Sequence, residues 1–157
     1  MSRRRRATKR KPSPDPVYGS ETIEKFTNRL MRDGKKSLAR RIVYKALKDF
    51  SAKVGSDDPL AAFEQAMENA MPTLEVKSRR IGGATYQVPI EITANRRRSM
   101  AMRWIIMYAG QKVGKNMIEG LAIELTDCFH NQGATIKKKD DTHRMAEANK
   151  AFAHYRW

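Results

Sequence analysis

Two short β-patterned runs flank the glycine pair Gly82-Gly83, and this arrangement constrains the fold more than any other stretch of the chain. The runs cover residues 73–81 and 85–92 and are rich in β-branched and aromatic residues. Runs of this length around glycines, which tolerate positive φ, are typical of a β-hairpin. We therefore predict a β-ribbon over residues 73–92, with basic residues near its turn.

The register of this ribbon depends on how its two strands match. A two-residue turn would place Lys77 opposite Val88, so that a charged side chain would face an apolar one. A three-residue loop over residues 82–84 instead pairs Val76 with Ile90. A slip of one residue turns every side chain to the other face, so the two registers exclude each other. We predict the three-residue loop.

The rest of the folded chain shows helical spacing of apolar residues and predicts about six helices. Polar residues suited to N-caps open four of these segments, at Ser20, Asp58, Asn95 and Asn116. A basic stretch, Thr135–Lys139, is expected to be a loop before a last helix that starts at Asp140-Asp141. The apolar stripe of the second helix is expected to bury Leu38, and Met145 is expected on the apolar stripe of the last helix.

These patterns predict a mainly α-helical protein, with the ribbon protruding from a single domain after the third helix. The 157 residues suffice for one core, because a domain of this size buries about 70% of the surface that its unfolded chain exposes. Residues 1–16 are basic and proline-rich, so we expect a flexible tail there and the helical domain over residues 17–157.

The charge of the chain is unevenly distributed. The net charge is +15, of which residues 1–11 carry +7 and residues 77–103 carry +6. Residues 12–76 contain ten basic and ten acidic side chains and are neutral as a whole. Blocks of one sign indicate an anionic partner, and a nucleic acid fits this pattern best.

Motifs for other functions are missing from the sequence. Cys128 is the only cysteine, which rules out a disulfide within the chain, and the three histidines show no zinc-binding spacing. Residues 110–116 resemble a phosphate-binding loop only faintly, because the final Ser or Thr is missing and the segment follows a helix. We therefore expect no enzyme activity, no cofactor and no metal. We also expect no membrane contact, because a spanning helix needs about 18 apolar residues in a row and the sequence contains no such run.

Several separated strings resemble the bacterial-type small-subunit ribosomal protein seven family. They occur in the order typical of that family and cover nearly the whole chain: Phe26-Thr27, Gly34-Lys35-Lys36, Ile42-Val43 with Ala46, Glu75–Arg80, Gly82–Pro89, Ala101–Trp104 and His143–Trp157. The resemblance implies a helical domain with a β-ribbon, in agreement with the patterns above.

The resemblance also implies a function. Members of the family are structural constituents of the small subunit that bind its RNA directly and nucleate assembly of the subunit head. They lie near the decoding region, with the ribbon beside exit-site tRNA and the path of mRNA, and they contact small-subunit proteins nine and eleven. For this chain, the implied place is the cytoplasmic ribosome of a bacterium, with an organelle as the alternative.

RNA duplexes are recognised mainly through shape, phosphate contacts and stacking, so cations are the first candidates for the site. The residues expected to bind ribosomal RNA are Arg3, Arg4, Arg5, Arg6, Lys9, Arg10, Lys11, Lys35, Lys36, Lys77, Arg79, Arg80, Arg96, Arg97, Arg98 and Arg103. On the ribbon, Gly82, Gly83 and Tyr86 are the candidates for the side that faces tRNA and mRNA.

Two sets of aromatic residues allow more than one interpretation. Tyr86 is expected either to stack on an RNA base or to pack across the ribbon. The terminal residues Phe152, Tyr155, Arg156 and Trp157 are expected either to hold down the last helix or to contact a neighbouring protein. A general DNA-compacting protein would share the basic charge and is the alternative function; it would bind duplex DNA as tightly as RNA.

Overall fold

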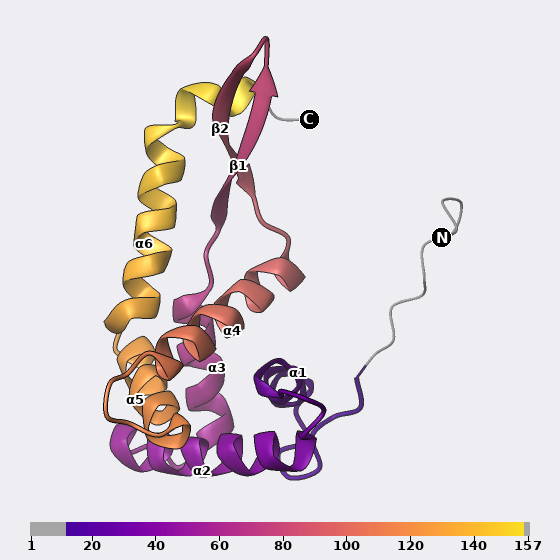
Figure 1. The fold of residues 1–157 in the computed structure, drawn as a ribbon. Helices are drawn as coiled ribbons and strands as arrows, with labels where there is room; N and C mark the ends of the chain where they lie inside the picture. The colour runs from indigo at the N-terminus through magenta and orange to yellow at the C-terminus, as the bar shows by residue number, and fades with distance from the viewer. Residues whose placement is uncertain (1–11, 156–157) are drawn as a thin grey trace, which may run out of the picture.

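The computed structural model describes residues 12–155. Along the chain its elements are α1 (Glu21–Leu30), α2 (Lys36–Val54), α3 (Pro59–Ala70), β1 (Leu74–Ile81), β2 (Ala84–Glu91), α4 (Ala94–Gly110), α5 (Met117–Phe129), α6 (Gly133–Ala148) and the 3-10 helix η1 (Lys150–Tyr155). Helices α1 to α5 form a body, from which the ribbon and α6 extend in the same direction (Figure 1). The mainly α-helical architecture with a hairpin after the third helix is confirmed.

The helices begin where side chains satisfy free backbone N–H groups. Ser20, Asp58 and Asn116 each accept hydrogen bonds from N–H groups two or three residues later, at 2.9–3.5 Å. These three predicted caps are confirmed. The fourth is wrong, because α4 has Thr93 as its N-cap and Asn95 lies inside the first turn.

The core lies among α1 to α5. Phe26, Phe50 and Phe63 are fully buried, and Phe26 meets Phe63 edge to face with ring centroids 5.3 Å apart. Each such ring removes a large apolar area from water, so these residues dominate the stability of the body. The expected burial of Leu38 is wrong, because its side chain is 45% exposed. Met145, on the stripe of the last helix, is 47% exposed.

Helices α4 and α5 are in close contact at Gly120. A Cβ atom added there would lie 2.4 Å from the carbonyl oxygen of Ala109, at the end of α4. Because a backbone atom occupies that space, a side chain at residue 120 would force the two helices apart.

The ribbon is a two-stranded antiparallel sheet in which Lys77 pairs with Val88 and Arg79 with Tyr86. This is the register of a two-residue turn, so the predicted three-residue loop is wrong. Gly82 and Gly83 have φ of 57° and 89°, and positive φ at both positions is what a two-residue turn of type I′ requires. Both mismatched cations have partners elsewhere, because Lys77 lies 3.7 Å from Glu75 of the same strand and Arg79 donates a hydrogen bond to the carbonyl oxygen of Tyr155.

The last helix begins earlier than predicted. Residues 135–139 belong to α6, which starts at Gly133, and they do not form a loop. The buried carboxylate of Glu124 in α5 accepts hydrogen bonds from the backbone N–H of Thr135 at 3.0 Å and from its hydroxyl at 2.7 Å. A side chain of a different helix thus satisfies the first turn of α6, which explains why no local cap marks it.

The N-terminal part of the described chain is fixed at Asp15. Its carboxylate accepts hydrogen bonds from the N–H groups of Val17 and Tyr18 and from the hydroxyl of Tyr44, at 2.6–3.1 Å. Burial and this contact with Asp15 raise the pKa of Tyr44 to about 12. The folded part therefore includes Asp15, which the sequence analysis assigned to the tail.

Candidate nucleic-acid interface

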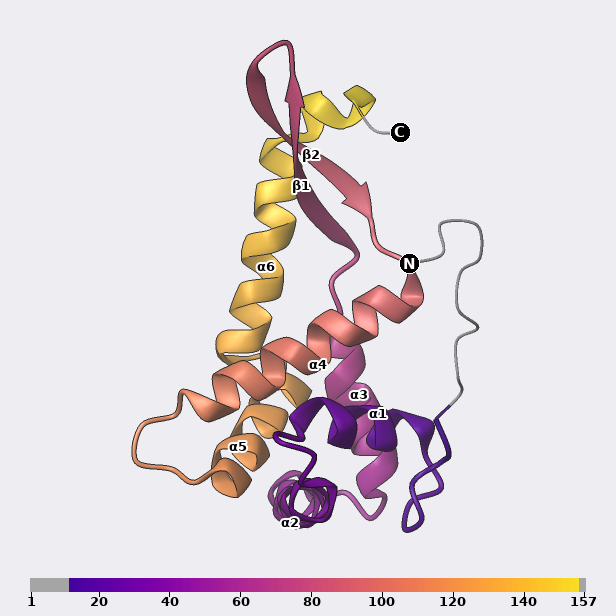
Figure 2. The same ribbon diagram turned by 45° about the vertical axis from the view of Figure 1, so that its right-hand side comes forward.

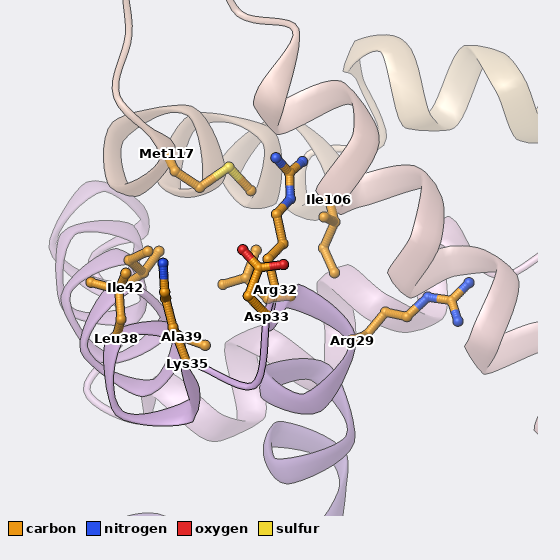
Figure 3. A pocket seen from close by; sticks show the side chains of 10 residues that line it. Arg29, Arg32, Asp33, Lys35, Leu38, Ala39, Ile42, Ile106 and Met117 are labelled. Atoms are coloured by element: carbon orange, nitrogen blue, oxygen red, sulfur yellow. The ribbon is translucent and has the colours of Figure 1, made fainter.

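A groove lies where the corner between α1 and α2 meets α4 and α5 (Figure 3). It has a volume of about 510 Å³, and Leu38, Ile106 and Met117 are among its apolar lining residues. Its cationic lining residues come from the corner and are Arg29, Arg32 and Lys35. The groove thus combines positive charge with an apolar wall, the two features that contact phosphates and bases.

The corner holds these cations at a tight turn. Asp33 and Gly34 have positive φ, of 51° and 72°, and α2 begins directly after Lys35. Figure 3 shows Arg32 and Lys35 extending toward the wall, whereas Arg29 points away from them. Among residues 12–155, none of these three cations forms an ion pair. A second hollow of about 440 Å³ adjoins Arg29 and Arg32 and adds Arg103.

Lys36, the other lysine of the corner, is used within the protein. Its ammonium binds the carboxylate of Glu24, which is 1% exposed and also accepts a hydrogen bond from Arg40 at 3.2 Å. The hydrogen bond from Lys36 is the main cause that lowers the pKa of Glu24. Lys35 and Lys36 were predicted to act together on RNA, but only Lys35 is left without an acidic partner.

The cations of α4 divide in the same way. Arg96 binds Glu75 of the ribbon at 2.7–2.9 Å through two nitrogens, and this pairing raises the pKa of Arg96. Arg97 donates a hydrogen bond from Nε to the carbonyl oxygen of Pro72 at 3.0 Å. Arg98 and Arg103 are exposed, and neither pairs with an acid in the part of the chain that the structure describes.

The ribbon carries cations along its length and ends in the Gly82-Gly83 turn, far from the helical body (Figure 1). Arg80 is exposed, Lys77 lies 3.7 Å from Glu75, and Arg79 donates a hydrogen bond to the carbonyl oxygen of Tyr155 at 3.3 Å. Arg80 is therefore the ribbon cation whose side chain is most open to a partner.

The aromatic residues of the ribbon and the C-terminus meet each other. The ring of Tyr86 lies 5.2 Å from that of Phe152 and 5.2 Å from that of Tyr155, measured between centroids. The sequence left two interpretations of Tyr86 open, stacking on an RNA base and packing across the ribbon. In the structure Tyr86 packs within the protein, but its ring partners Phe152 and Tyr155 belong to η1 and not to the opposite strand.

Comparison with known proteins identifies the family. The family model described as "Ribosomal protein S7p/S5e" matches residues 2–150. The chain belongs to this family. It is 67% identical to the small ribosomal subunit protein uS7 of Protochlamydia amoebophila (strain UWE25), 63% identical to that of Chlamydia felis (strain Fe/C-56) and 61% identical to that of Chlamydia trachomatis serovar D. Each comparison spans 157 residues, the full length of both chains.

Membership of the S7p/S5e family confirms the resemblance found in the sequence. The structure divides the predicted RNA-binding residues into exposed cations and cations that bind acids of the protein itself. Lys35, Arg80, Arg98 and Arg103 lie open on the surface, whereas Lys36 and Arg96 bind buried acids. Nine predicted site residues lie outside the described part of the chain: Arg3, Arg4, Arg5, Arg6, Lys9, Arg10, Lys11, Arg156 and Trp157.

Sequence reasoning missed four residues of this interface. Arg29 and Arg32 line the groove. The sequence feature that could have indicated them is their location at and just after the end of the first helix, away from its apolar stripe. Glu24 and Glu75 decide which cations are occupied. Both acids appeared to be ordinary helix-start or strand charges, because their partners lie 12 and 21 residues away in the sequence.

The described residues meet neither the requirements of a metal site nor those of a membrane-spanning helix. No group of three or more His, Cys, Asp or Glu side chains in residues 12–155 is placed to hold a metal ion. Cys128 is buried, and burial raises the pKa of its thiol to about 12. No helix of this part of the chain has the length and apolar character needed to cross a membrane.

Proposed function

We propose that this chain is a structural constituent of the small ribosomal subunit that binds ribosomal RNA of the subunit head directly. The observation that carries the proposal is its full-length similarity to proteins named small ribosomal subunit protein uS7, at 61–67% identity. The role is non-catalytic, and the ribosome in question is that of a bacterial cytoplasm.

The cations of the structure support a recognition mechanism based on phosphate and shape. Arg29, Arg32 and Lys35 approach the RNA backbone from the corner, and the apolar wall of the groove covers an unpaired base. Arg98 and Arg103 extend the same positive surface along α4, and Lys77, Arg79 and Arg80 grip a second RNA element along the ribbon. The basic N-terminal residues add further phosphate contacts, and the release of counterions strengthens binding.

We also propose a finer placement, which the family resemblance implies and the protruding ribbon supports. The body binds early to the folded RNA of the head and nucleates its assembly. The protruding ribbon, with Gly82 and Gly83 at its tip, reaches toward exit-site tRNA and the path of mRNA near the decoding region (Figure 1). Small-subunit proteins nine and eleven are the proposed protein neighbours, and the C-terminal residues Arg156 and Trp157 are candidates for one of these contacts.

The test is a binding titration of the full-length protein with a head-domain ribosomal RNA fragment. If about six to ten phosphates are neutralised, affinity will fall about 10³- to 10⁵-fold between about 50 and 200 mM salt. A duplex DNA of equal length is the competitor and should displace little protein. Equal affinity for DNA would instead support a DNA-compacting protein, and a flat salt dependence would contradict the phosphate mechanism.

A second measurement tests assembly in the cell. Gradient sedimentation of an extract separates free protein from subunits, and the protein is expected to migrate with small subunits. Migration at the position of a free protein would overturn the ribosomal role.

A further inference from the structure

The ribbon contacts the C-terminal part of the chain at two separate places. At its root, the N–H of Thr73 donates a hydrogen bond to Nε2 of His143 in α6 at 2.9 Å. Near its tip, Tyr86 meets Phe152 and Tyr155 of η1, and Arg79 binds the Tyr155 carbonyl oxygen. Figures 1 and 2 show α6 running beside the ribbon and η1 turning onto its strands.

A groove lies between the ribbon and α6, although the two elements remain in contact beside it. The groove has a volume of about 450 Å³ and is lined by Leu74 and Pro89 on the ribbon side and by Ala146 and Glu147 on the helix side. Helix α6 packs against β1 beside this groove, whereas β2 is held to the C-terminal part of the chain mainly by η1. A two-stranded hairpin is only marginally stable by itself, so its direction depends on these contacts with α6 and η1.

The contact near the tip is built from rings. Tyr86 is half-buried on an otherwise exposed part of the ribbon, and the rings of Phe152 and Tyr155 lie nearly parallel, at 11° to each other. The chain reaches this position because α6 ends at Ala148 and continues as a tighter 3-10 turn, which carries both rings onto the ribbon.

We propose that η1 is a strap that fixes the direction of the ribbon, and that Tyr86 is the positioning residue on which it closes. This inference rests on the proposed RNA-binding function and deepens it. With the strap closed, Lys77, Arg79 and Arg80 are arranged for RNA before binding. Ordering the ribbon then costs no affinity at the moment of contact.

The direction of the ribbon is measured by spin labels on the full-length protein, one at Ala84→Cys beside the tip and one at Lys137→Cys on α6. Cys128 is buried with its pKa raised to about 12, so it stays unlabelled in the folded state. We expect a narrow distance distribution in the parent protein, and a broad one after Tyr86→Ala or Phe152→Ala. Tyr86→Phe keeps the ring and Thr85→Ala changes an exposed neighbour, so both serve as controls that stay narrow.

The same variants are then titrated with the head-domain RNA. Tyr86→Ala and Phe152→Ala should each weaken binding about tenfold, because the ribbon has to be ordered on contact. The double variant should bind no worse than either single one, since both break one contact. The salt slope should stay unchanged, whereas Arg80→Ala should lower it by about 0.7–0.9 per lost phosphate contact.

Three results would overturn the strap. Unchanged distance distributions would show that η1 does not fix the ribbon, and broad distributions with unchanged affinity would show that the fixed direction is irrelevant to RNA. Weaker binding for Tyr86→Ala but not for Phe152→Ala would mean that Tyr86 touches the RNA itself. If the parent protein fails to bind the RNA, the proposed function falls, while the distances still report on the strap.

Discussion

Glu75 in β1 and Arg96 in the first turn of α4 are joined by a two-nitrogen contact. Nε of Arg96 lies 2.9 Å from both carboxylate oxygens, and Nη2 lies 2.7 Å from Oε2. The acid is 6% exposed, whereas the arginine side chain is 54% exposed. One guanidinium therefore fixes the root of the ribbon to the helical body while still facing solvent.

Replacing Arg96 with alanine should destabilise the fold. The change removes the two-nitrogen contact of the buried Glu75 carboxylate and leaves Lys77 at 3.7 Å, and an under-satisfied buried acid costs about 1–3 kcal/mol. Urea denaturation at neutral pH measures the free energy of unfolding. Arg98→Ala, two residues later in the same helix and exposed, is the matched control and should change the free energy of unfolding by less than about 0.5 kcal/mol. Equal losses for the two variants would contradict the role of the pair.

The neighbouring lysines Lys35 and Lys36 should give opposite phenotypes. Lys36→Ala removes a partner of the buried Glu24 and should cost about 1–3 kcal/mol of unfolding free energy. Lys35→Ala should leave stability within about 0.5 kcal/mol, because its side chain is exposed.

Binding to the head-domain RNA completes that comparison. Lys35→Ala should weaken binding and lower the salt slope, since a phosphate contact is lost. Lys36→Ala, measured well below its melting temperature, should keep the slope of the parent protein. A lower slope for Lys36→Ala alone would show that the two residues have exchanged roles.

Stability should fall as the pH drops from about 7.5 to 5, because of His143. Burial is the main cause that lowers the pKa of this imidazole, with Lys139 and Arg97 adding to it and Asp140 opposing it. The folded state therefore favours the neutral ring, whose Nε2 accepts the hydrogen bond from Thr73. This contribution is fully present above the unfolded pKa of 6.5 and is lost as the pH falls through the lower folded value.

The measurement is urea unfolding at several pH values within that range. His143→Gln cannot titrate, so it should flatten the pH dependence relative to the parent protein. A variant with the parent's full pH dependence would assign the effect to other groups.

Two glycine-to-alanine changes should move stability in opposite directions. Gly120→Ala should destabilise by about 1–3 kcal/mol, because its Cβ meets the Ala109 carbonyl oxygen at 2.4 Å. Gly110→Ala meets no atom within 4 Å and has no positive φ, so it should stabilise by up to about 1 kcal/mol. Thermal unfolding followed by circular dichroism compares the two, and a tolerated Gly120→Ala would show that the helices can move apart.

Local signals in the sequence predicted the elements that depend on local contacts. The ribbon was found from alternation around Gly82-Gly83, and three helix starts from Ser20, Asp58 and Asn116. Such features need only residues within a few positions of each other, so they can be read along the chain.

Features set by distant partners were the ones that sequence reasoning missed. The observed register pairs Arg79 with Tyr86, and both residues also contact η1, about 70 residues later in the chain. The start of α6 depends on Glu124 in another helix. Likewise, a net charge of +15 did not show that Lys36 and Arg96 are neutralised inside the protein.

The attachment of the ribbon at both root and tip has a mechanical consequence. A hairpin held only at its base can change its direction freely, so a displacement of its tip bends the hairpin and does not reach the rest of the protein. This hairpin is held both at its root, by Arg96, and near its tip, where Tyr86 meets η1. We therefore expect a displacement at Gly82-Gly83 to reach α4 through Arg96 and α6 through η1.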